Sequence, residues 1–285
     1  MREIRYLALS GGSLRGLAHV GAIEKLVDEG LLRLNRIKSV AGASAGSVVA
    51  LFLATGHTLP EIWEAIRVLD TSHLIQPDPS LLLTHFGFDS GSRLQSYFEG
   101  LVYKATGNKH ATFSELFQVT GRELIVVGTC MEDKKAIYYS HRTTPHFKVA
   151  VAVRISTSIP LFFTPVRHGG KTYFDGSMMD DYPLHLYSHC LSQAVGIMIC
   201  SSYNTEFQYL EEFPRALLNL AMFKYYSHDY RSYPENTIYV DEIDEGNHSL
   251  DFHISPEVIQ FYRERGARAA LKWINQAEAT TESTF

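Results

Sequence analysis

The amino-terminal part of the chain repeats one arrangement, in which a short apolar run enters a glycine-rich turn and then an apolar helical segment. In the first unit the run spans residues 4–9, and helical spacing of apolar residues begins after Gly16. In the second unit, residues 37–41 lead through a glycine turn into residues 48–54. Buried strands that lead directly into helices are typical of a parallel sheet joined by crossover helices. The arrangement predicts an α/β fold with a mostly parallel central sheet.

The rest of the chain shows further strand and helix patterns around an irregular segment at residues 71–91. Helices are expected from Thr58 and over 92–106, 147–158, 214–226 and 256–277, and strands over 123–129, 135–140, 172–174, 193–200 and 237–241. The chain has no Pro-, Gly- or Ser-rich linker and no internal sequence repeat. A single domain is therefore predicted over residues 1–278, followed by a polar, frayed tail over 279–285.

A G-x-S-x-G sequence lies between the second predicted strand and its helix, with Ser44 at its centre between Gly42 and Gly46. A serine on such a turn has strained backbone angles, and glycines two residues away remove side chains that would clash there. The turn presents the serine hydroxyl at the carboxyl edge of the sheet, near a helix N-terminus that favours developing negative charge. The placement predicts a nucleophile. The alternative is a structural turn, because the bare motif also arises by chance.

The glycine turn after the first strand reads Ser10-Gly11-Gly12-Ser13-Leu14-Arg15-Gly16. Glycines leave backbone N–H groups accessible to a ligand oxyanion, so the loop predicts an oxyanion hole. A fixed cation at Arg15 would orient the loop or bias its electric field. A nucleotide phosphate loop is one alternative, but the glycine order is G-G-x-x-x-G rather than G-x-G-x-x-G, and G-x-x-x-x-G-K-[ST] is absent. A tight turn without a ligand is another.

A third turn follows the strand-like residues 172–174, where Asp175 precedes Gly176 and Ser177. An aspartate before a glycine is common in turns and is by itself a structural feature. Together with a candidate nucleophile and a candidate oxyanion loop, Asp175 is also a candidate functional residue. A strand end followed by glycine would hold the Asp175 carboxylate at the edge of the sheet with little room around it.

Together these segments resemble the blocks of the patatin-like phospholipase family. The matching segments are residues 7–16, residues 42–47 and Asp175-Gly176-Ser177, with residues 154–160 and 180–183 similar to the runs on either side of the family's aspartate block. The resemblance extends roughly from residue 5 to residue 200, about two thirds of the chain. Two positions differ: Ser13 stands where the family pattern G-G-G-x-R-G has its third glycine, and Ser177 where D-G-G has its second.

The resemblance implies a three-layer α/β/α fold and a lipid acyl hydrolase of the phospholipase A or lysophospholipase type. Ser44 matches the family's nucleophile, and Asp175 matches the carboxylate that accepts its proton. The implied reaction forms an acyl-enzyme on Ser44, which water then hydrolyses without a cofactor. The remaining matched positions are the oxyanion loop Gly11, Gly12 and Ser13, the basic residue Arg15, and the supporting glycines Gly16, Gly42, Gly46 and Gly176.

Several alternatives remain at this point. The same fold could serve an acyltransferase or a small-ester esterase, or a non-catalytic lipid-binding relative, for which Ser13 is the one indication in the sequence. In the α/β-hydrolase order, a Ser-His-Asp triad would have its acid and then its histidine after Ser44, and none of the histidines there lies in a glycine-flanked turn after a buried strand as Asp175 does. The nominal candidates are His185, His189, His228, His248 and His253.

Composition and charge exclude other function classes. The 26 lysines and arginines against 31 aspartates and glutamates give a net charge of −5, which argues against nucleic-acid binding by bulk charge and against a strong general attraction to anionic membranes. The three cysteines and scattered histidines show no metal-ligand spacing, so no metal is expected. Without a recognisable signal peptide or an apolar segment of bilayer length, we expect a cytoplasmic protein or one peripheral at a membrane.

Two apolar segments outside the motifs are candidates for lipid contact. Residues 81–88 contain three leucines and two phenylalanines, and an aromatic-rich run extends over residues 207–230. Either could form an acyl-chain channel or touch a membrane, and ordinary packing is the alternative for each. The expected partners are a phospholipid or another lipid ester and, peripherally, a membrane surface.

Overall fold

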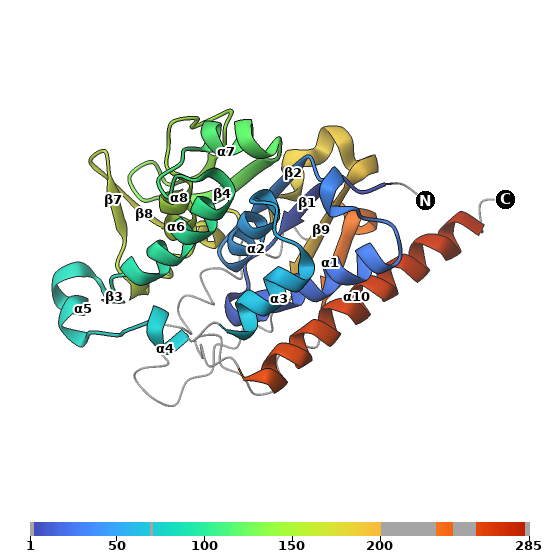
Figure 1. Cartoon of the computed structure of the whole chain (residues 1–285), viewed down its shortest axis with the longest axis horizontal. Helices are drawn as coiled ribbons and strands as arrows, with labels where there is room; N and C mark the ends of the chain where they lie inside the picture. Colours follow the sequence, from blue (N-terminus) through green and yellow to red (C-terminus); the bar gives the residue numbers. More distant parts are fainter. Residues whose placement is uncertain (1–2, 69–70, 201–231, 242–254, 283–285) are drawn as a thin grey trace.

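The computed structural model describes residues 3–68, 71–200, 232–241 and 255–282, and it shows a central sheet with helices packed along it (Figure 1). Parallel pairing joins β10, β9, β1, β2 and β4 in that order, whereas β5, β8 and β7 extend the sheet by antiparallel pairing beyond β4. The strands are β1 (Tyr6–Leu9), β2 (Ser39–Gly42), β4 (Glu123–Cys130), β5 (Lys135–Tyr139), β7 (Val166–His168), β8 (Lys171–Asp175), β9 (Ala194–Ile199) and β10 (Thr237–Val240).

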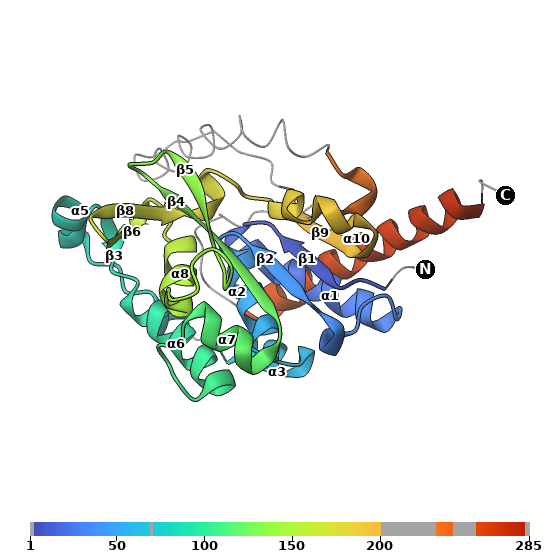
Figure 2. The same ribbon diagram turned by 90° about the horizontal axis from the view of Figure 1, so that it is seen from above.

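Side chains of the parallel strands alternate between two hydrophobic cores, one on each face of the sheet. In β1, Leu7 and Leu9 join the larger core, while Ala8 joins the smaller one. The larger core is covered by α1 (Leu17–Asp28), α2 (Ala45–Ala54) and α8 (Val149–Ser156), which lie along one face in Figure 2. The smaller core packs under the 3-10 helix η4 (Pro183–Gln193). The predicted three-layer α/β/α fold is confirmed.

The register of the sheet brings the ends of its central strands to one edge. Leu9, the last residue of β1, is paired with Gly42 at the end of β2 and with Ile197 in β9. In parallel strands these ends meet at the same edge, where ligands bind in open α/β sheets. The glycine loop after β1 and the G-x-S-x-G turn after β2 are therefore neighbours.

The segment predicted to be irregular is largely regular. It contains α4 (Thr71–Leu74), α5 (Pro79–His85) and β3 (Gly87–Asp89), which pairs with β6 (Leu161–Phe163) to form a separate two-stranded sheet. The start of α5 is explained locally, because the Asp78 side chain accepts from the Ser80 N–H and proline occupies the first helical position. The pairing of β3 with β6 joins residues more than 70 positions apart, and the local pattern does not reveal it.

The other helices are α3 (Leu59–Arg67), α6 (Ser92–Thr106), α7 (Phe113–Thr120) and α10 (Pro256–Glu282). Helix α7 is not among the helices expected from the sequence, although Thr112 and Glu115 form a capping box at its start, a signal that can be seen in the sequence. The helix expected over 214–226 lies outside the described residues. Among the residues that the structure describes, no helix combines the length and hydropathy needed to cross a bilayer.

Helices α1 and α10 approach each other closely through two glycines. A Cβ atom on Gly21 would lie 2.2 Å from the Arg263 carbonyl oxygen, and one on Gly266 would lie 2.0 Å from the Ala18 carbonyl oxygen. Beside this contact the Arg263 guanidinium donates two hydrogen bonds to Glu24, at 2.7 and 2.8 Å. The glycines therefore set the distance between the helices, and the ion pair fixes their register.

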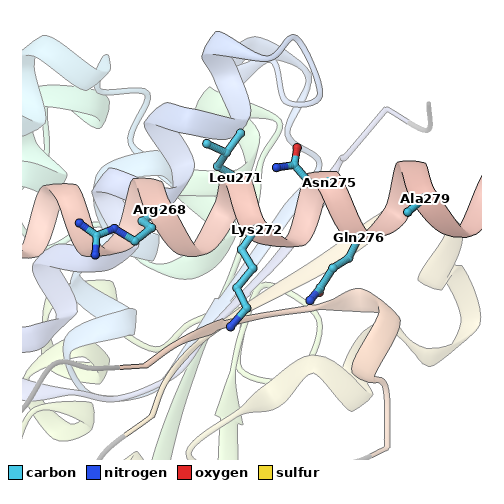
Figure 3. Close-up of a pocket in the computed structure, with 6 residues that line it drawn as sticks. All are labelled: Arg268, Leu271, Lys272, Asn275, Gln276 and Ala279. Carbon is cyan, nitrogen blue, oxygen red and sulfur yellow. The ribbon is translucent and has the colours of Figure 1, made fainter.

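In its C-terminal half, α10 has partly exposed side chains, Leu271 among them. Figure 3 shows Leu271 and Lys272 on this part of the helix, and the Lys272 ammonium lies 3.6 Å from the Asp241 carboxylate after β10. The helix runs to Glu282, beyond the end expected at residue 277 and into the segment expected to be a frayed tail.

We predict that Gly266→Ala lowers the free energy of unfolding by about 2 kcal/mol, because the new methyl group would overlap a backbone carbonyl that cannot move without separating the helices. Denaturant unfolding followed by circular dichroism measures the change. Gly100→Ala in α6 is the matched control, since a Cβ there meets nothing within 4 Å and alanine favours the helix. Equal stability of the two variants would show that the α1–α10 contact is not limiting.

Candidate active site

Ser44 lies on a sharp turn between β2 and α2 that only small neighbours allow. Its backbone angles are φ 48° and ψ −125°, a sparsely populated conformation for a residue with a side chain. A Cβ on Gly46 would lie 2.4 Å from the Leu9 carbonyl oxygen, and one on Gly42 would lie 2.4 Å from the Gly46 carbonyl oxygen. The turn therefore closes tightly against the end of β1, which places the Ser44 side chain at the edge of the sheet.

Asp175 lies at the end of β8 and contacts Ser44 directly. The Ser44 hydroxyl donates to Asp175 Oδ2 at 2.8 Å, and the Ser177 N–H donates to Oδ1 at 2.9 Å. The main chain is also held, because Thr129 Oγ1 donates to the Asp175 carbonyl oxygen at 2.8 Å. The two side chains are nearly sealed from solvent, with 7% of Ser44 and 3% of Asp175 exposed. The structure thus brings together the predicted nucleophile and the predicted carboxylate.

Burial raises the pKa of Asp175 to about 7, because the ionised form loses its hydration inside the protein. Hydrogen bonds from Ser177 and Ser44 act in the opposite direction, and the nearby Asp181 carboxylate adds to the increase. A carboxylate with a pKa near 7 is a much better proton acceptor than an exposed aspartate, whose pKa is near 4. The environment of Asp175 therefore suits a general base.

The glycine loop differs from the expectation in one donor. The Gly11 N–H donates to Asp181, at 3.1 Å to the side chain and 3.3 Å to the carbonyl oxygen. It is thus engaged inside the protein and does not fit the oxyanion role predicted for it. Within the described part of the chain, the N–H groups of Gly12 and Ser13 donate no hydrogen bond. These two groups are the candidate oxyanion donors, and Gly11 instead joins the loop to the segment after Asp175.

Two hydrogen bonds orient the peptide groups that carry the candidate donors. The Ser10 hydroxyl donates to the Gly11 carbonyl at 2.9 Å, and Arg15 Nε donates to the Gly12 carbonyl at 3.3 Å. In a trans peptide the carbonyl and the following N–H point in opposite directions, so holding one aims the other. Arg15 thus acts on the Ser13 N–H through the peptide plane, which is consistent with the orienting role predicted for it.

A buried histidine supports the start of the same loop. His19 in α1 is completely buried, and its Nε2 lies 2.8 Å from the Ser10 carbonyl oxygen, so this nitrogen is the donor. Burial lowers the pKa of His19 to about 4, which keeps the ring neutral at physiological pH. The sequence analysis did not single out this residue, because its partner is a backbone carbonyl nine positions away.

Ser13 adopts the positive φ of 51° that glycine adopts without strain. For a residue with a side chain this conformation costs about 1–2 kcal/mol. Its hydroxyl is buried and has no hydrogen-bond partner in the described regions. The other matched glycines are sites of close packing: Gly16 faces Ala45, and Gly176 faces the Val127 carbonyl.

An apolar cavity of about 190 Å³ opens beside Ser44. Ser13 and Ser44 are among its few polar lining residues. Its lining residues come from several elements that are distant in the sequence: α1, α2, α3, α6 and the α4 and β6 regions. The apolar lining includes Val20, Val49, Phe52, Ile66, Leu94 and Phe163.

The end of α8 touches both members of the pair, which the sequence analysis did not anticipate. The Ser156 hydroxyl oxygen accepts from the Ser44 N–H at 3.0 Å, and the Ser158 carbonyl oxygen accepts from the Asp175 N–H at 3.0 Å. One turn earlier, the buried Arg154 donates to the carbonyl oxygens of Ser90 and Thr164, at 2.9 and 3.0 Å. From the sequence, segment 154–160 is similar to a family block and has no assigned role; its contacts give it a structural role.

Two of the five nominal triad histidines lie in the part of the chain that the structure describes, and neither is a hydrogen-bond partner of the Ser44 hydroxyl. His185 is half exposed and lies 3.8 Å from Asp180 and 3.4 Å from the Tyr138 hydroxyl, and His189 is exposed. The other three nominal candidates, at positions 228, 248 and 253, lie outside the described residues. The Ser44 hydroxyl therefore has a carboxylate as its acceptor in this structure.

Comparison with known proteins gives matches over most of the chain. Residues 7–187 match the model of a family described as patatin-like phospholipase. An uncharacterized protein of Acanthamoeba polyphaga mimivirus is 32% identical over 198 residues, which are 68% of this chain and 65% of the viral protein. A probable lipid hydrolase of Invertebrate iridescent virus 6 is 27% identical over 183 residues, 63% of this chain and 62% of that protein. The matches span slightly less than two thirds of either viral relative.

A solved structure has a similar fold. VipD from Legionella pneumophila matches 96% of this chain and 67% of its own, with a TM-score of 0.71 and 17% sequence identity. At this identity the likeness concerns the fold alone.

We predict that Asp175→Asn stabilises the protein at neutral pH. The folded state binds a proton at Asp175 more tightly than the unfolded state, so this group's contribution to stability is present below about pH 4 and lost as the pH rises to about 7. Relative to the wild type, the variant should gain about 4 kcal/mol between pH 4 and pH 8. Unfolding with urea across this range measures the difference.

The control is Asp133→Asn, whose stability relative to the wild type should change with pH in the opposite direction. A hydrogen bond from Lys171 is the main cause that lowers the pKa of Asp133, so Asp133→Asn should lose stability relative to the wild type as the pH rises to about 5, with little further change up to pH 8. A stability difference for Asp175→Asn that does not change with pH would show that its carboxyl is not perturbed by burial.

Proposed function

The chain belongs to the patatin-like phospholipase family, and from that premise we propose that it is a serine hydrolase that cleaves fatty-acyl esters of lipids, of the phospholipase A or lysophospholipase type. The observation that supports this most strongly is the 2.8 Å hydrogen bond from the Ser44 hydroxyl to a buried aspartate beside an apolar cavity. A hydroxyl next to a base can attack an ester, and an apolar cavity next to the hydroxyl can receive the acyl chain.

In the first step, Ser44 Oγ attacks the ester carbonyl carbon while its proton passes to Asp175 Oδ2. The carbonyl oxygen becomes an oxyanion, which the N–H groups of Gly12 and Ser13 stabilise. The N-terminus of α2, which begins at Ala45, adds a favourable electrostatic potential at the same place. The proton on Asp175 then moves to the leaving alkoxide, which departs as the alcohol and leaves the acyl group on Ser44.

In the second step, water hydrolyses the acyl-enzyme. Asp175, ionised again, accepts a proton from the water as its oxygen attacks the acyl carbon, and the same two N–H groups stabilise the second oxyanion. Collapse of this intermediate breaks the ester bond to Ser44, returns the proton to Ser44 Oγ and releases the fatty acid. The raised pKa of Asp175 favours each proton acceptance near neutral pH.

We propose that the enzyme meets its substrate at a lipid surface through one end of the molecule. Leu83 in α5 is 87% exposed, and Phe86, the residue that follows the last residue of α5, is 54% exposed. Leu161 is also exposed. It pairs with Gly87 across the β3–β6 sheet, so it lies next to Phe86. We call Leu83, Phe86 and Leu161 the apolar tip. Figure 1 places α5 and β3 at one end of the molecule. Segments next to the tip also line the cavity, through Leu74 and Phe163.

We predict that Ser44→Ala abolishes both ester hydrolysis and labelling by a fluorophosphonate probe, because the attacking oxygen is removed. Asp175→Asn should lower kcat on the order of a thousandfold, whereas His185→Ala and His189→Ala should lower it by about tenfold at most. Assays with a glycerophospholipid, a lysophospholipid, a triacylglycerol and a short nitrophenyl ester measure turnover and define the substrate class. Circular dichroism controls for folding.

The pH profile adds a second readout for the same prediction. Below about pH 7, kcat/KM should fall about tenfold per pH unit, because only ionised Asp175 can accept the serine proton. Undiminished turnover in folded Ser44→Ala, or a thousandfold loss from a single histidine substitution, would contradict the proposed pair.

We predict that Leu83→Asp lowers hydrolysis of phosphatidylcholine vesicles about tenfold or more, because the charge opposes insertion of the apolar tip into the lipid. Hydrolysis of a short, water-soluble nitrophenyl ester should change less than about twofold. Val119→Asp is the matched control, since Val119 is 60% exposed on α7 and lies outside the tip. Equal losses in the two variants, or equal losses on both substrates, would argue against membrane contact at this end.

A further inference from the structure

All the polar groups of Ser44 make hydrogen bonds. Its hydroxyl donates to Asp175, and its carbonyl oxygen accepts from the Ser47 hydroxyl at 2.6 Å and the Ser47 N–H at 2.9 Å. Its N–H donates to the Ser156 hydroxyl oxygen at 3.0 Å. Ser47 belongs to the same turn of chain as Ser44, whereas Ser156 lies 112 positions away in another helix. The hydrogen bond to Ser156 is thus a long-range restraint on the nucleophile's backbone.

The strain at Ser44 makes such a restraint necessary. A residue in this region of φ and ψ is higher in energy by about 1–3 kcal/mol and persists only where its surroundings determine it. The glycine contacts of the turn prevent the chain from moving toward β1. A hydrogen bond to the Ser44 N–H acts differently, because it fixes the orientation of the peptide group before Ser44 and therefore the direction in which the side chain points.

The same end of α8 also holds Asp175. The Asp175 N–H donates to the Ser158 carbonyl oxygen, two residues after Ser156. One short stretch of chain therefore contacts the backbones of both reacting residues, which are 131 positions apart. The separation of Ser44 Oγ and Asp175 Oδ2 depends on the geometry of this stretch as well as on the sheet.

The stretch is itself rigidly anchored. Arg154 is 2% exposed, and its guanidinium donates to the Ser158 hydroxyl and to the carbonyl oxygens of Ser90 and Thr164. The guanidinium also lies over the Phe163 ring, 5.0 Å from its centre. These contacts connect the end of α8 to the β3–β6 region on its far side. Ser156 thus lies on a part of the helix that has little freedom to move.

We propose that Ser156 is a positioning residue for the nucleophile: its hydroxyl accepts the Ser44 N–H and holds Ser44 in the strained conformation from which Oγ reaches Asp175. It touches neither the substrate nor the transferred proton. The inference rests on the proposed function, because it assigns Ser156 a role in the reaction of Ser44. It predicts a defect in the reactivity of Ser44 that is separate from substrate binding and from the ionisation of Asp175.

The test compares variants that keep or remove the hydroxyl in side chains of matched size. Ser156→Ala removes the acceptor, and Ser156→Thr and Ser156→Val form a second pair that differs only in hydroxyl against methyl. For each folded variant, the measurements are the rate of Ser44 labelling by a fluorophosphonate, kcat and KM on a nitrophenyl ester, and the pH profile. Circular dichroism and the unfolding free energy report on the fold.

We expect Ser156→Ala to lower the labelling rate and kcat about 10- to 100-fold, because a buried N–H loses its partner at the nucleophile. KM should change less than about threefold, and the pH at half-maximal activity should stay the same, since Asp175 is held by a main-chain carbonyl that the substitution keeps. Ser156→Thr should react at least about tenfold faster than Ser156→Val.

Ser140→Ala separates positioning from a general loss of stability. Ser140 is also a buried serine whose hydroxyl accepts backbone N–H groups, those of Arg142 and Thr143, but it lies in the turn after β5 rather than at the active site. The Ser140→Ala variant should lose stability and retain the labelling rate of the wild type.

Three outcomes would overturn the inference: wild-type reactivity in Ser156→Ala, equal reactivity in the Thr and Val variants, or an equal labelling defect in Ser140→Ala. A wild-type protein that neither reacts with the probe nor hydrolyses any ester would instead overturn the proposed function. If Ser156→Ala does not fold, the difference in reactivity between Ser156→Thr and Ser156→Val decides whether the hydroxyl at this position is needed.

Discussion

The proposed active site depends on one constraint, the placement of a non-glycine residue, Ser44, at a positive φ. The conformation is unfavourable by itself, so the surrounding structure has to enforce it. Gly42 and Gly46 let the turn close against the end of β1. Ser44 accepts a hydrogen bond from Ser47 in α2 and donates to Ser156 in α8 and to Asp175 in β8, so each of its polar groups is engaged. The sheet register that aligns the ends of β1 and β2 is thus a requirement of the site as well as of the fold.

Asp175 shows how stability and reactivity oppose each other in this site. Burial, together with the nearby Asp181 carboxylate, makes its ionised form unfavourable, which lowers stability at neutral pH and gives the carboxyl a pKa near 7. An exposed aspartate would cost nothing in stability and would be a weak base. The Ser177 N–H moderates the effect by stabilising the charge, so the base remains accessible to ionisation in the physiological range.

Most of the features that the sequence predicts have a local cause, although the locally capped helices α5 and α7 were missed. The turn at Ser44, the strand before Asp175 and the helix over 92–106 each follow from glycines, apolar spacing and caps within a few residues. Features that depend on partners distant in the chain could not be predicted. The Gly11 N–H appears available in the sequence, yet it is bound by Asp181, 170 positions away. The β3–β6 pairing and the contacts of Ser156 and Ser158 escaped notice for the same reason.

The two strained serines at the cavity are restrained in different ways. Ser44, at φ 48°, is held by hydrogen bonds to each of its polar groups. Ser13, at φ 51°, has a hydroxyl that makes none in the described regions, and its conformation depends on its neighbours, through the bond from Arg15 to the Gly12 carbonyl and the packing of Gly16 on Ala45. In the proposed reaction the Ser44 side chain reacts while Ser13 contributes its N–H. At Ser44, where the side chain would react, the structure therefore restrains the side chain. At Ser13, where only the N–H would be used, it restrains the peptide group instead.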